Sequence, residues 1–297
     1  MGPRRPWATT FPKHPGSPKN GALRPIVSRP QRQIHPSHAA VERPLSTSPP
    51  SVMLEPRRTL YGSLDCIVID GGPSPKVLVV LCHGYGAPGS DLASLAFEWI
   101  TLLGEDAGDF RFVFPAAPQT LAEMGMPDGR AWWPINMAQL AQHVQSSSFS
   151  ELHTAVPPGI DEARQTLSDS ITAMKAEMGA PDAPLVLGGF SQGAMLTLDT
   201  ALRGTIDPPQ ILILFSGTLV CQSHWNASLS RLQQTRVYQS HGNVDPILPY
   251  SSAVALSQWL SEAGIETEFH SFRGGHTIDG ESIETTAQWM NALPRDA

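Results

Sequence analysis

Residues 185–196 read Leu185-Val186-Leu187-Gly188-Gly189-Phe190-Ser191-Gln192-Gly193-Ala194-Met195-Leu196. An apolar run typical of a strand leads into the pattern Gly-x-Ser-x-Gly, and good helix formers follow without a break. This order predicts a strand, a sharp turn and a helix, with Ser191 on the turn. Because such a turn is strained, Gly189 and Gly193 must lack a Cβ to avoid collision. Ser191 would then stand exposed at the carboxyl edge of a sheet, beside the amide of Gln192 in the first helical turn.

Strands and helices alternate on both sides of this turn. Apolar runs predict strands at residues 65–69, 76–82, 111–114, 184–187, 210–215, 236–240 and 267–272. Periods of three and four predict helices at residues 92–103, 160–178 and 251–263, and a final helix that contains Ile283, Ala287 and Met290. The alternation implies an α/β fold with a mostly parallel central sheet and helices on both faces.

Composition narrows the class of protein. The 297 residues are 41% hydrophobic, which is ordinary for a globular chain, and no window approaches the ~20 continuous apolar residues of a membrane span. Three cysteines, Cys66, Cys82 and Cys221, are an odd number without metal-type spacing, which favours free thiols in a reducing compartment. We therefore expect a cytoplasmic protein. We expect no metal, and the sequence leaves monomer and homodimer open.

Residues 1–58 differ from the rest of the chain. They carry twelve prolines, and ten Lys and Arg against only Glu42 and Glu55, with no lasting periodicity. Such a segment cannot bury enough surface to offset its ordering entropy, so we expect a disordered tail before a domain at 59–297. An organelle transit peptide, a nucleic-acid or lipid-binding tail, and an over-extended reading frame with the true start at Met53 are the alternatives. The last is favoured, so we expect no nucleic-acid partner.

Chemically active side chains follow three of the predicted strands. Ser191 lies in the first segment, Asp245 in His241-Gly242-Asn243-Val244-Asp245-Pro246, and His276 in Arg273-Gly274-Gly275-His276. The carboxyl ends of parallel strands meet at one crevice, so these side chains are expected to converge. A histidine accepts the proton of a serine hydroxyl, and a carboxylate orients that histidine.

Other residues compete for these roles. His83, His241 and His270 are alternative bases, and Asp279 and Glu281 are alternative acids beside His276. The two acids are placed where a helix begins, and acids there are favoured by the helix dipole alone. A lone Gly-x-Ser-x-Gly also fits a plain connection with a capping serine.

A glycine-rich turn, His83-Gly84-Tyr85-Gly86-Ala87, follows the strand at 76–82. If Ser191 is a nucleophile, the amides of Tyr85 and Gln192 are the two donors of an oxyanion hole. The glycines otherwise only permit a tight turn, and His83 is otherwise a packed structural histidine.

The long region 119–158 follows, with an amphipathic stretch at 135–144. Its tryptophans argue against disorder, so we interpret it as the wall and roof of an acyl-binding groove formed by Met126, Trp132 and Trp133. The alternative is that the tryptophans merely cover the core.

The four segments around Tyr85, Ser191, Asp245 and His276 together resemble the phospholipase/carboxylesterase family, which includes the acyl-protein thioesterases. The resemblance covers residues 60–289. It implies an α/β-hydrolase fold, no cofactor, and hydrolysis of carboxylic esters and thioesters, including lysophospholipids in some members. It implies Ser191 as nucleophile, His276 as base, Asp245 as orienting acid, and Tyr85 and Gln192 as backbone donors. Tyr85 and Ala194 are more similar to the bacterial esterase branch than to the eukaryotic thioesterases.

The sequence therefore predicts a serine carboxylesterase that forms an acyl-enzyme from a small-molecule ester. The alternative from another functional class is a non-catalytic binding protein with the same fold. Proteins that have lost the activity usually lack one of the three catalytic residues, whereas Ser191, Asp245 and His276 are all present here. A dienelactone-type hydrolase or a peptidase is the nearer alternative.

Overall fold

The computed structural model describes residues 55–295. The predicted disordered tail, residues 1–58, lies outside the described residues except for positions 55–58. The alternative start at Met53 also lies outside them. Of the described helices, none has the length and apolar character needed to cross a membrane.

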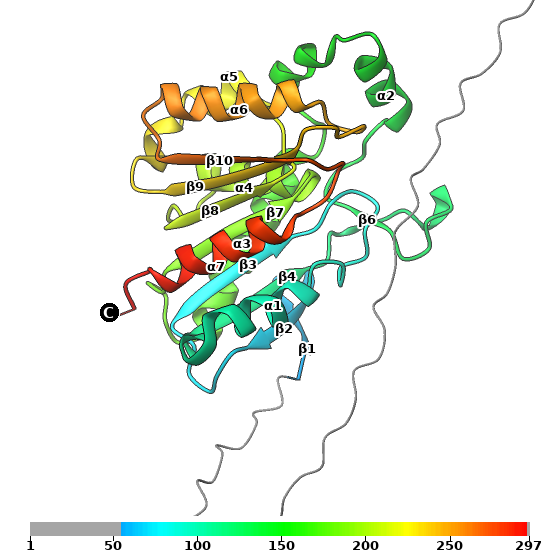
Figure 1. The fold of residues 1–297 in the computed structure, drawn as a ribbon. Coiled ribbons are helices and arrows are strands. Elements are labelled where there is room, and N and C mark those ends of the chain that lie inside the picture. Colours follow the sequence, from blue (N-terminus) through cyan, green and yellow to red (C-terminus); the bar gives the residue numbers. More distant parts are fainter. Residues whose placement is uncertain (1–54, 296–297) are drawn as a thin grey trace, which may run out of the picture. The chain divides into compact units, whose positions relative to one another are not determined.

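The described chain is built on an eight-stranded sheet with the order β1-β2-β4-β3-β7-β8-β9-β10 (Figure 1). The strands are β1 (Arg57–Tyr61), β2 (Leu64–Asp70), β3 (Val77–Cys82), β4 (Phe110–Pro115), β7 (Leu185–Phe190), β8 (Ile211–Phe215), β9 (Arg236–Gly242) and β10 (Thr267–Phe272). β1 pairs antiparallel with β2, and β2 with β4; the six strands from β4 to β10 are parallel. The predicted mostly parallel sheet is confirmed.

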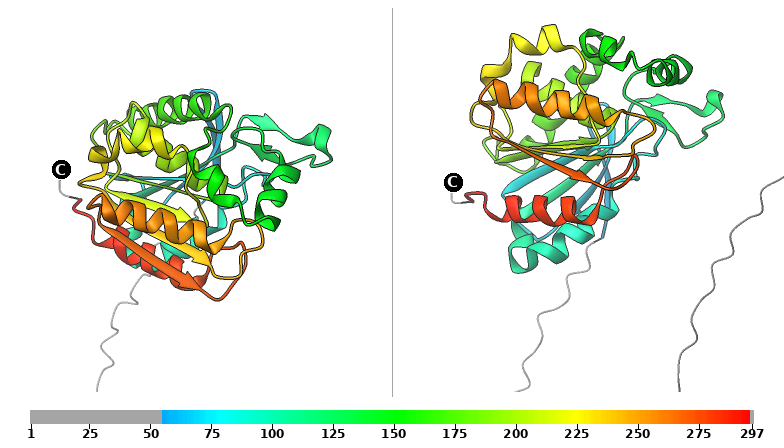
Figure 2. Two further views of the ribbon diagram at one scale, coloured as in Figure 1. Left: turned by 90° about the horizontal axis from the view of Figure 1, so that it is seen from above. Right: turned by 45° about the horizontal axis from the view of Figure 1, so that its top comes forward.

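Helices cover both faces of this sheet, as predicted (Figures 1 and 2). The helices are α1 (Ser94–Leu103), α2 (Met137–Gln145), α3 (Ile160–Glu177), α4 (Gln192–Arg203), α5 (Gln222–Asn226), α6 (Tyr250–Glu262) and α7 (Gly280–Asn291). One buried apolar cluster joins the sheet to α1 and α7, and another joins it to α3, α4 and α6. β3, β4, β7 and β8 are buried along their whole length or nearly so. Their sequences are therefore apolar, with Arg111 of β4 as the exception; it pairs with Asp70.

Two features were absent from the prediction. β1 begins at Arg57, inside the range assigned to the tail, because Arg58 forms an ion pair with Asp65 across the β1–β2 hairpin and Arg57 reaches Glu177. Pairing with β2 thus orders residues whose composition matches the tail. A short hairpin of β5 (Gln119–Thr120) and β6 (Arg130–Ala131) extends beyond the main sheet on the same side as α2.

A buried ionic cluster fixes α4 to its neighbours. Asp199 has no exposed surface, and its carboxylate accepts hydrogen bonds from Arg203 Nε at 2.7 Å, Trp225 Nε1 at 2.6 Å and Arg164 Nη1 at 3.0 Å. These three donors join α3 and α5 to the helix that follows Ser191.

We expect Asp199→Ala to lower the free energy of unfolding by about 3–5 kcal/mol, because it removes the fully buried carboxylate that Arg164 and Arg203 share. The two guanidinium groups then keep only the exposed Asp161 as a counter-ion. Urea denaturation measures this change. Glu266→Ala is the matched control: it breaks the exposed ion pair with Arg236, and we expect a loss of about 0–1 kcal/mol. Equal losses in the two variants would contradict the role of burial.

Candidate active site

Ser191 lies on the turn between β7 and α4 with φ 55° and ψ −116°, a conformation that side chains rarely adopt. Its amide donates to Phe215 O of β8 at 2.9 Å, which holds the strained turn in place. A Cβ on Gly193 would lie 2.0 Å from Cys82 O, and one on Gly189 would lie 2.4 Å from the carbonyl carbon of Gly193. The prediction that these two glycines prevent collision is therefore confirmed.

Asp245 and His276 come from the loops after β9 and β10, and the structure joins them. His276 Nδ1 and Asp245 Oδ2 are 2.6 Å apart, and the other carboxylate oxygen accepts the amides of Ile247 and Leu248 at 2.8 and 3.0 Å. The two loops are also joined by a backbone hydrogen bond from Val244 N to Gly274 O. The carboxylate is thus fixed from both sides, and it fixes the plane of the imidazole.

Asp245 is buried, yet it is ionised. Burial by itself raises the pKa of this carboxyl, but hydrogen bonds from His241 and His276 and from the amide of Leu248 outweigh burial and hold the pKa well below its ordinary value. A negative charge therefore lies directly behind the imidazole of His276, where it stabilises the imidazolium form.

Ser191 and His276 line one cavity. The His276 ring also packs against Phe190, the residue before Ser191, with ring centroids 4.8 Å apart. Asp245 lies behind His276 with its side chain fully buried. The structure thus brings the hydroxyl and the imidazole to one cavity and keeps the carboxylate out of solvent.

The other histidines considered from the sequence have structural partners. His241 is buried at the end of β9 and donates from Nε2 to Leu248 O at 2.9 Å and toward Asp245 Oδ2 at 3.2 Å. His270 pairs with Asp279, which caps α7. His83 is buried and hydrogen bonds to backbone through both ring nitrogens. The contact from His241 to Asp245 was not predicted; their i, i+4 spacing in one segment was the available signal.

Two residues beside this cavity have backbone amides without a hydrogen-bond partner within residues 55–295. The residues are Tyr85, in the turn after β3, and Gln192, the first residue of α4. Both residues line the cavity. Free amides beside a hydroxyl and an imidazole can bind a developing negative charge.

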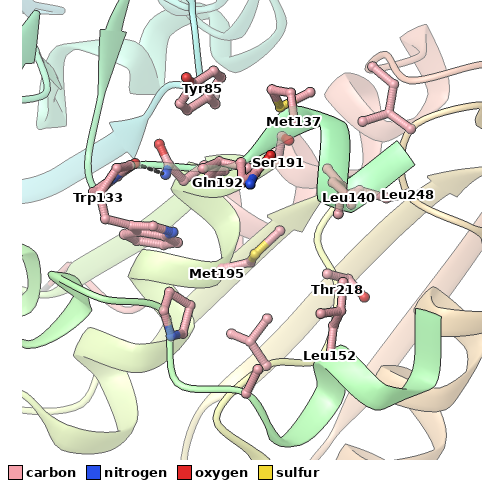
Figure 3. A pocket seen from close by; sticks show the side chains of 18 of the residues that line it. Tyr85, Trp133, Met137, Leu140, Leu152, Ser191, Gln192, Met195, Thr218 and Leu248 are labelled. Carbon is pink, nitrogen blue, oxygen red and sulfur yellow. Dashed lines mark hydrogen bonds between the residues drawn. The ribbon is translucent and has the colours of Figure 1, made fainter. Parts of the chain in front are cut away.

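The cavity has a volume of about 360 Å³ and is mostly apolar (Figure 3). Its walls come from the region 133–158, the start of α4 and the loops after β8 and β9, through side chains that include Trp133, Met137, Leu140, Leu152, Met195 and Leu248. Trp133 is thus part of the wall. Trp132 and Met126 are not among the lining residues: Trp132 is buried beneath the wall, and Met126 lies against Gly86 at the hairpin.

The side chain of Gln192 has a structural role that the sequence did not suggest. Its Oε1 accepts the amide of Trp132 at 3.0 Å, and its Nε2 donates to Trp133 O at 2.9 Å, as Figure 3 shows for the second bond. The residue that supplies one free amide therefore also holds the wall of the cavity.

Within the described range, one group of side chains has the composition of a metal site: His270, Asp279 and Glu281. Its members already pair with one another, and Asp279 also caps α7. None of the three lines the Ser191 cavity.

The sequence profile of the phospholipase/carboxylesterase family matches residues 65–293. The chain belongs to this family. As a member of this family it is a hydrolase of the serine esterase class with the α/β-hydrolase fold, and both predictions are confirmed.

Relatives of this family member cover most of its length. It is 25% identical to acyl-protein thioesterase 1 of Gibberella zeae, over 77% of this chain and 95% of the relative. It is 26% identical to acyl-protein thioesterase 1 homolog 1 of Dictyostelium discoideum, over 73% and 91%. Among solved structures, esterase PE8 is 27% identical with a TM-score of 0.60, over 76% of this chain and 97% of that one. The carboxylesterase of Mesorhizobium loti, 15% identical over 80% and 99%, shares the fold with a TM-score of 0.60.

Proposed function

We propose that this chain hydrolyses carboxylic esters with an apolar acyl group, through Ser191, His276 and Asp245. The observation that carries the proposal is the 2.6 Å contact between His276 Nδ1 and Asp245 Oδ2, next to the cavity that Ser191 lines. A carboxylate at Nδ1 leaves Nε2 of the neutral ring free to accept a proton.

The reaction runs in two halves. His276 accepts the hydroxyl proton of Ser191 as the oxygen attacks the ester carbonyl, and the imidazolium then protonates the departing alcohol. The acyl group stays on Ser191 until a water molecule, deprotonated by the same imidazole, attacks it and releases the acid. Asp245 keeps its charge throughout and stabilises each imidazolium that forms.

Negative charge develops on the carbonyl oxygen in both halves. The amides of Tyr85 and Gln192 are the donors that would receive it. Both are backbone groups, so they are already oriented before the substrate enters, and no reorganisation is needed when the charge appears.

The cavity supports an apolar acyl group of medium length as substrate. Leu140, Leu152 and Met195 offer it an apolar surface. Among residues 55–295, the lining side chains that can carry a charge are those of Asp91, His143 and His276. The burial of each methylene group is worth about 0.8 kcal/mol, so binding energy grows with chain length until the cavity is full.

We expect kcat/KM for p-nitrophenyl esters to rise from acetate to octanoate, by up to about fourfold for each methylene that is buried. Steady-state hydrolysis of the acetate, butyrate, hexanoate and octanoate esters measures this. Met195→Trp, which fills the cavity beside Ser191, should reduce the octanoate rate far more than the acetate rate. Leu102→Trp on the exposed face of α1 is the control, and a flat profile in the unmodified protein would contradict the acyl-pocket assignment.

The proposal extends to the leaving group of the substrate, which could be a thiol or a lysophospholipid headgroup as well as a simple alcohol. The names of the thioesterase relatives support thioesters, and lysophospholipids also carry a single apolar acyl chain. Both would form the same acyl-enzyme at Ser191. A cytoplasmic location is supported by Cys66, Cys82 and Cys221, which are free and buried.

A further inference from the structure

A chain of hydrogen bonds runs beneath the floor of the Ser191 cavity, and the mechanism above does not use it. It consists of the side chains of His83, Trp132 and Gln192, none more than 2% exposed. The three residues come from the turn after β3, from the residues just after β6 and from the start of α4.

The first link controls the peptide between Gly84 and Tyr85. His83 Nε2 lies 3.0 Å from the amide of Ala117, which can only donate, so Nε2 is the unprotonated nitrogen. Nδ1 therefore carries the proton and donates to Gly84 O at 2.8 Å. Burial lowers the pKa of His83, which keeps the ring in this neutral form.

Holding Gly84 O also aims the amide of Tyr85. In a trans peptide the carbonyl oxygen and the amide hydrogen point in opposite directions, and all the peptides described here are trans. The carbonyl points at the His83 ring, so the amide points the other way. This turn touches the residue expected to attack, since a Cβ on Gly84 would lie only 3.3 Å from the Cβ of Ser191.

The second link ties this turn to the start of α4. The indole Nε1 of Trp132 donates to His83 O at 2.9 Å, and the indole lies against the His83 ring with centroids 5.6 Å apart. The amide of Trp132 donates to Oε1 of Gln192 at 3.0 Å. Trp132 thereby connects the segments that carry the two free amides, although these lie more than a hundred positions apart in sequence.

We propose that His83 and Trp132 are positioning residues that fix the amide of Tyr85 relative to the amide of Gln192, so that both amides reach one oxyanion. The inference rests on the proposed esterase function. Neither residue lines the cavity, so neither side chain would touch the substrate. Their effect is therefore expected on the stabilisation of the tetrahedral state and not on binding of the ester.

The test uses four variants of the full chain. Trp132→Phe removes the indole donor and keeps an aromatic ring. His83→Leu removes the imidazole, whereas His83→Asn keeps an amide donor close to the position of Nδ1 and serves as the conservative variant. Trp99→Phe is the matched control, because Trp99 is equally buried on the far face of the sheet and donates to Ile283 O and Thr286 Oγ1.

Three quantities are measured for p-nitrophenyl octanoate, all per active site titrated with a fluorophosphonate: kcat, KM and the Ki of an octyl trifluoromethyl ketone. This ketone adds to a serine and forms a tetrahedral oxyanion. Loss of one oxyanion donor costs about 10²–10³ in kcat, so misplacing one should cost about tenfold to a hundredfold. We expect Trp132→Phe and His83→Leu to show that loss with KM within about twofold, and the ketone's Ki to rise in parallel with the loss.

A fifth variant combines Trp132→Phe with His83→Leu. It should lose about as much as the worse single variant, since both changes release the same amide. His83→Asn should recover most of the kcat lost in His83→Leu, and Trp99→Phe should keep kcat and Ki. The inference is overturned if Ki does not change in the first two variants, if their defect lies in KM, or if Trp99→Phe shows the same loss.

The proposed function fails in a different way. If the unmodified chain neither turns over the ester nor reacts with the fluorophosphonate, the esterase assignment falls. If the unmodified chain is active and the variants match it, only the positioning role falls. A variant that does not fold is replaced by Gln192→Met, which removes the link at its other end and must give the same signature in Ki.

Discussion

Ser191→Ala is expected to reduce kcat for p-nitrophenyl octanoate by about six orders of magnitude, because the acyl-enzyme can no longer form. Residual hydrolysis would come only from the two amides and from binding. The change removes one hydroxyl and keeps the backbone, so the strained turn, held by the bond to Phe215 O, should persist. Ester hydrolysis with enough enzyme to detect the residual rate measures the effect.

The control for this variant is Ser216→Ala. Ser216 lies after the neighbouring strand β8, also has a positive φ of 47°, and donates to Thr277 O beside His276. Losing that hydrogen bond is expected to cost about 1 kcal/mol of stability. The kcat of Ser216→Ala should stay within about tenfold of the value of the unmodified protein. If Ser191→Ala retained comparable turnover, another group would have to be the nucleophile.

Asp245→Asn is expected to lower kcat by about four orders of magnitude with little change in KM. An asparagine can present its amide nitrogen to Nδ1, which forces the imidazole into the tautomer with its proton on Nε2, where it cannot accept from Ser191. The buried negative charge that stabilises the imidazolium is lost as well. Steady-state kinetics on octanoate and acetate esters would separate kcat from KM.

Asp279→Asn is the matched control for Asp245→Asn. Asp279 makes a similar contact, 2.9 Å from His270 Nε2, at the end of the loop that carries His276. Asparagine caps a helix about as well as aspartate. It should leave kcat within a few-fold. A large loss in Asp279→Asn with a small one in Asp245→Asn would exchange the roles of the two carboxylates.

The sequence was sufficient for the parts of the fold that repeat a pattern. Uninterrupted apolar runs identified the inner strands, and glycines around Ser191 identified the turn, because Cβ atoms at Gly189 and Gly193 would collide with backbone. The sequence was insufficient where hydrogen bonding between strands decides whether a segment is ordered. Arg57 and Arg58 look like the tail that precedes them, and only hydrogen bonding to β2 makes them a strand.

The same limit applies to the cavity. Two adjacent tryptophans drew attention to the wall, but only Trp133 lines it, while Trp132 points beneath it toward His83 O. The two tryptophans form a bend directly after β6, and no periodic pattern in the sequence says which of them faces the cavity. Side-chain hydrogen bonds such as those of Gln192 to the backbone of Trp132 and Trp133 depend on where distant loops meet, and no local pattern encodes that.

The central claim is that Ser191 is a nucleophile activated by His276. Fluorophosphonate labelling followed by peptide mass spectrometry tests it most directly. We predict one adduct per chain, on the peptide that contains Ser191, with a labelling rate that falls by orders of magnitude in His276→Ala and is kept in His270→Ala. An adduct on another residue, or an unlabelled chain that still hydrolyses the ester, would contradict the account.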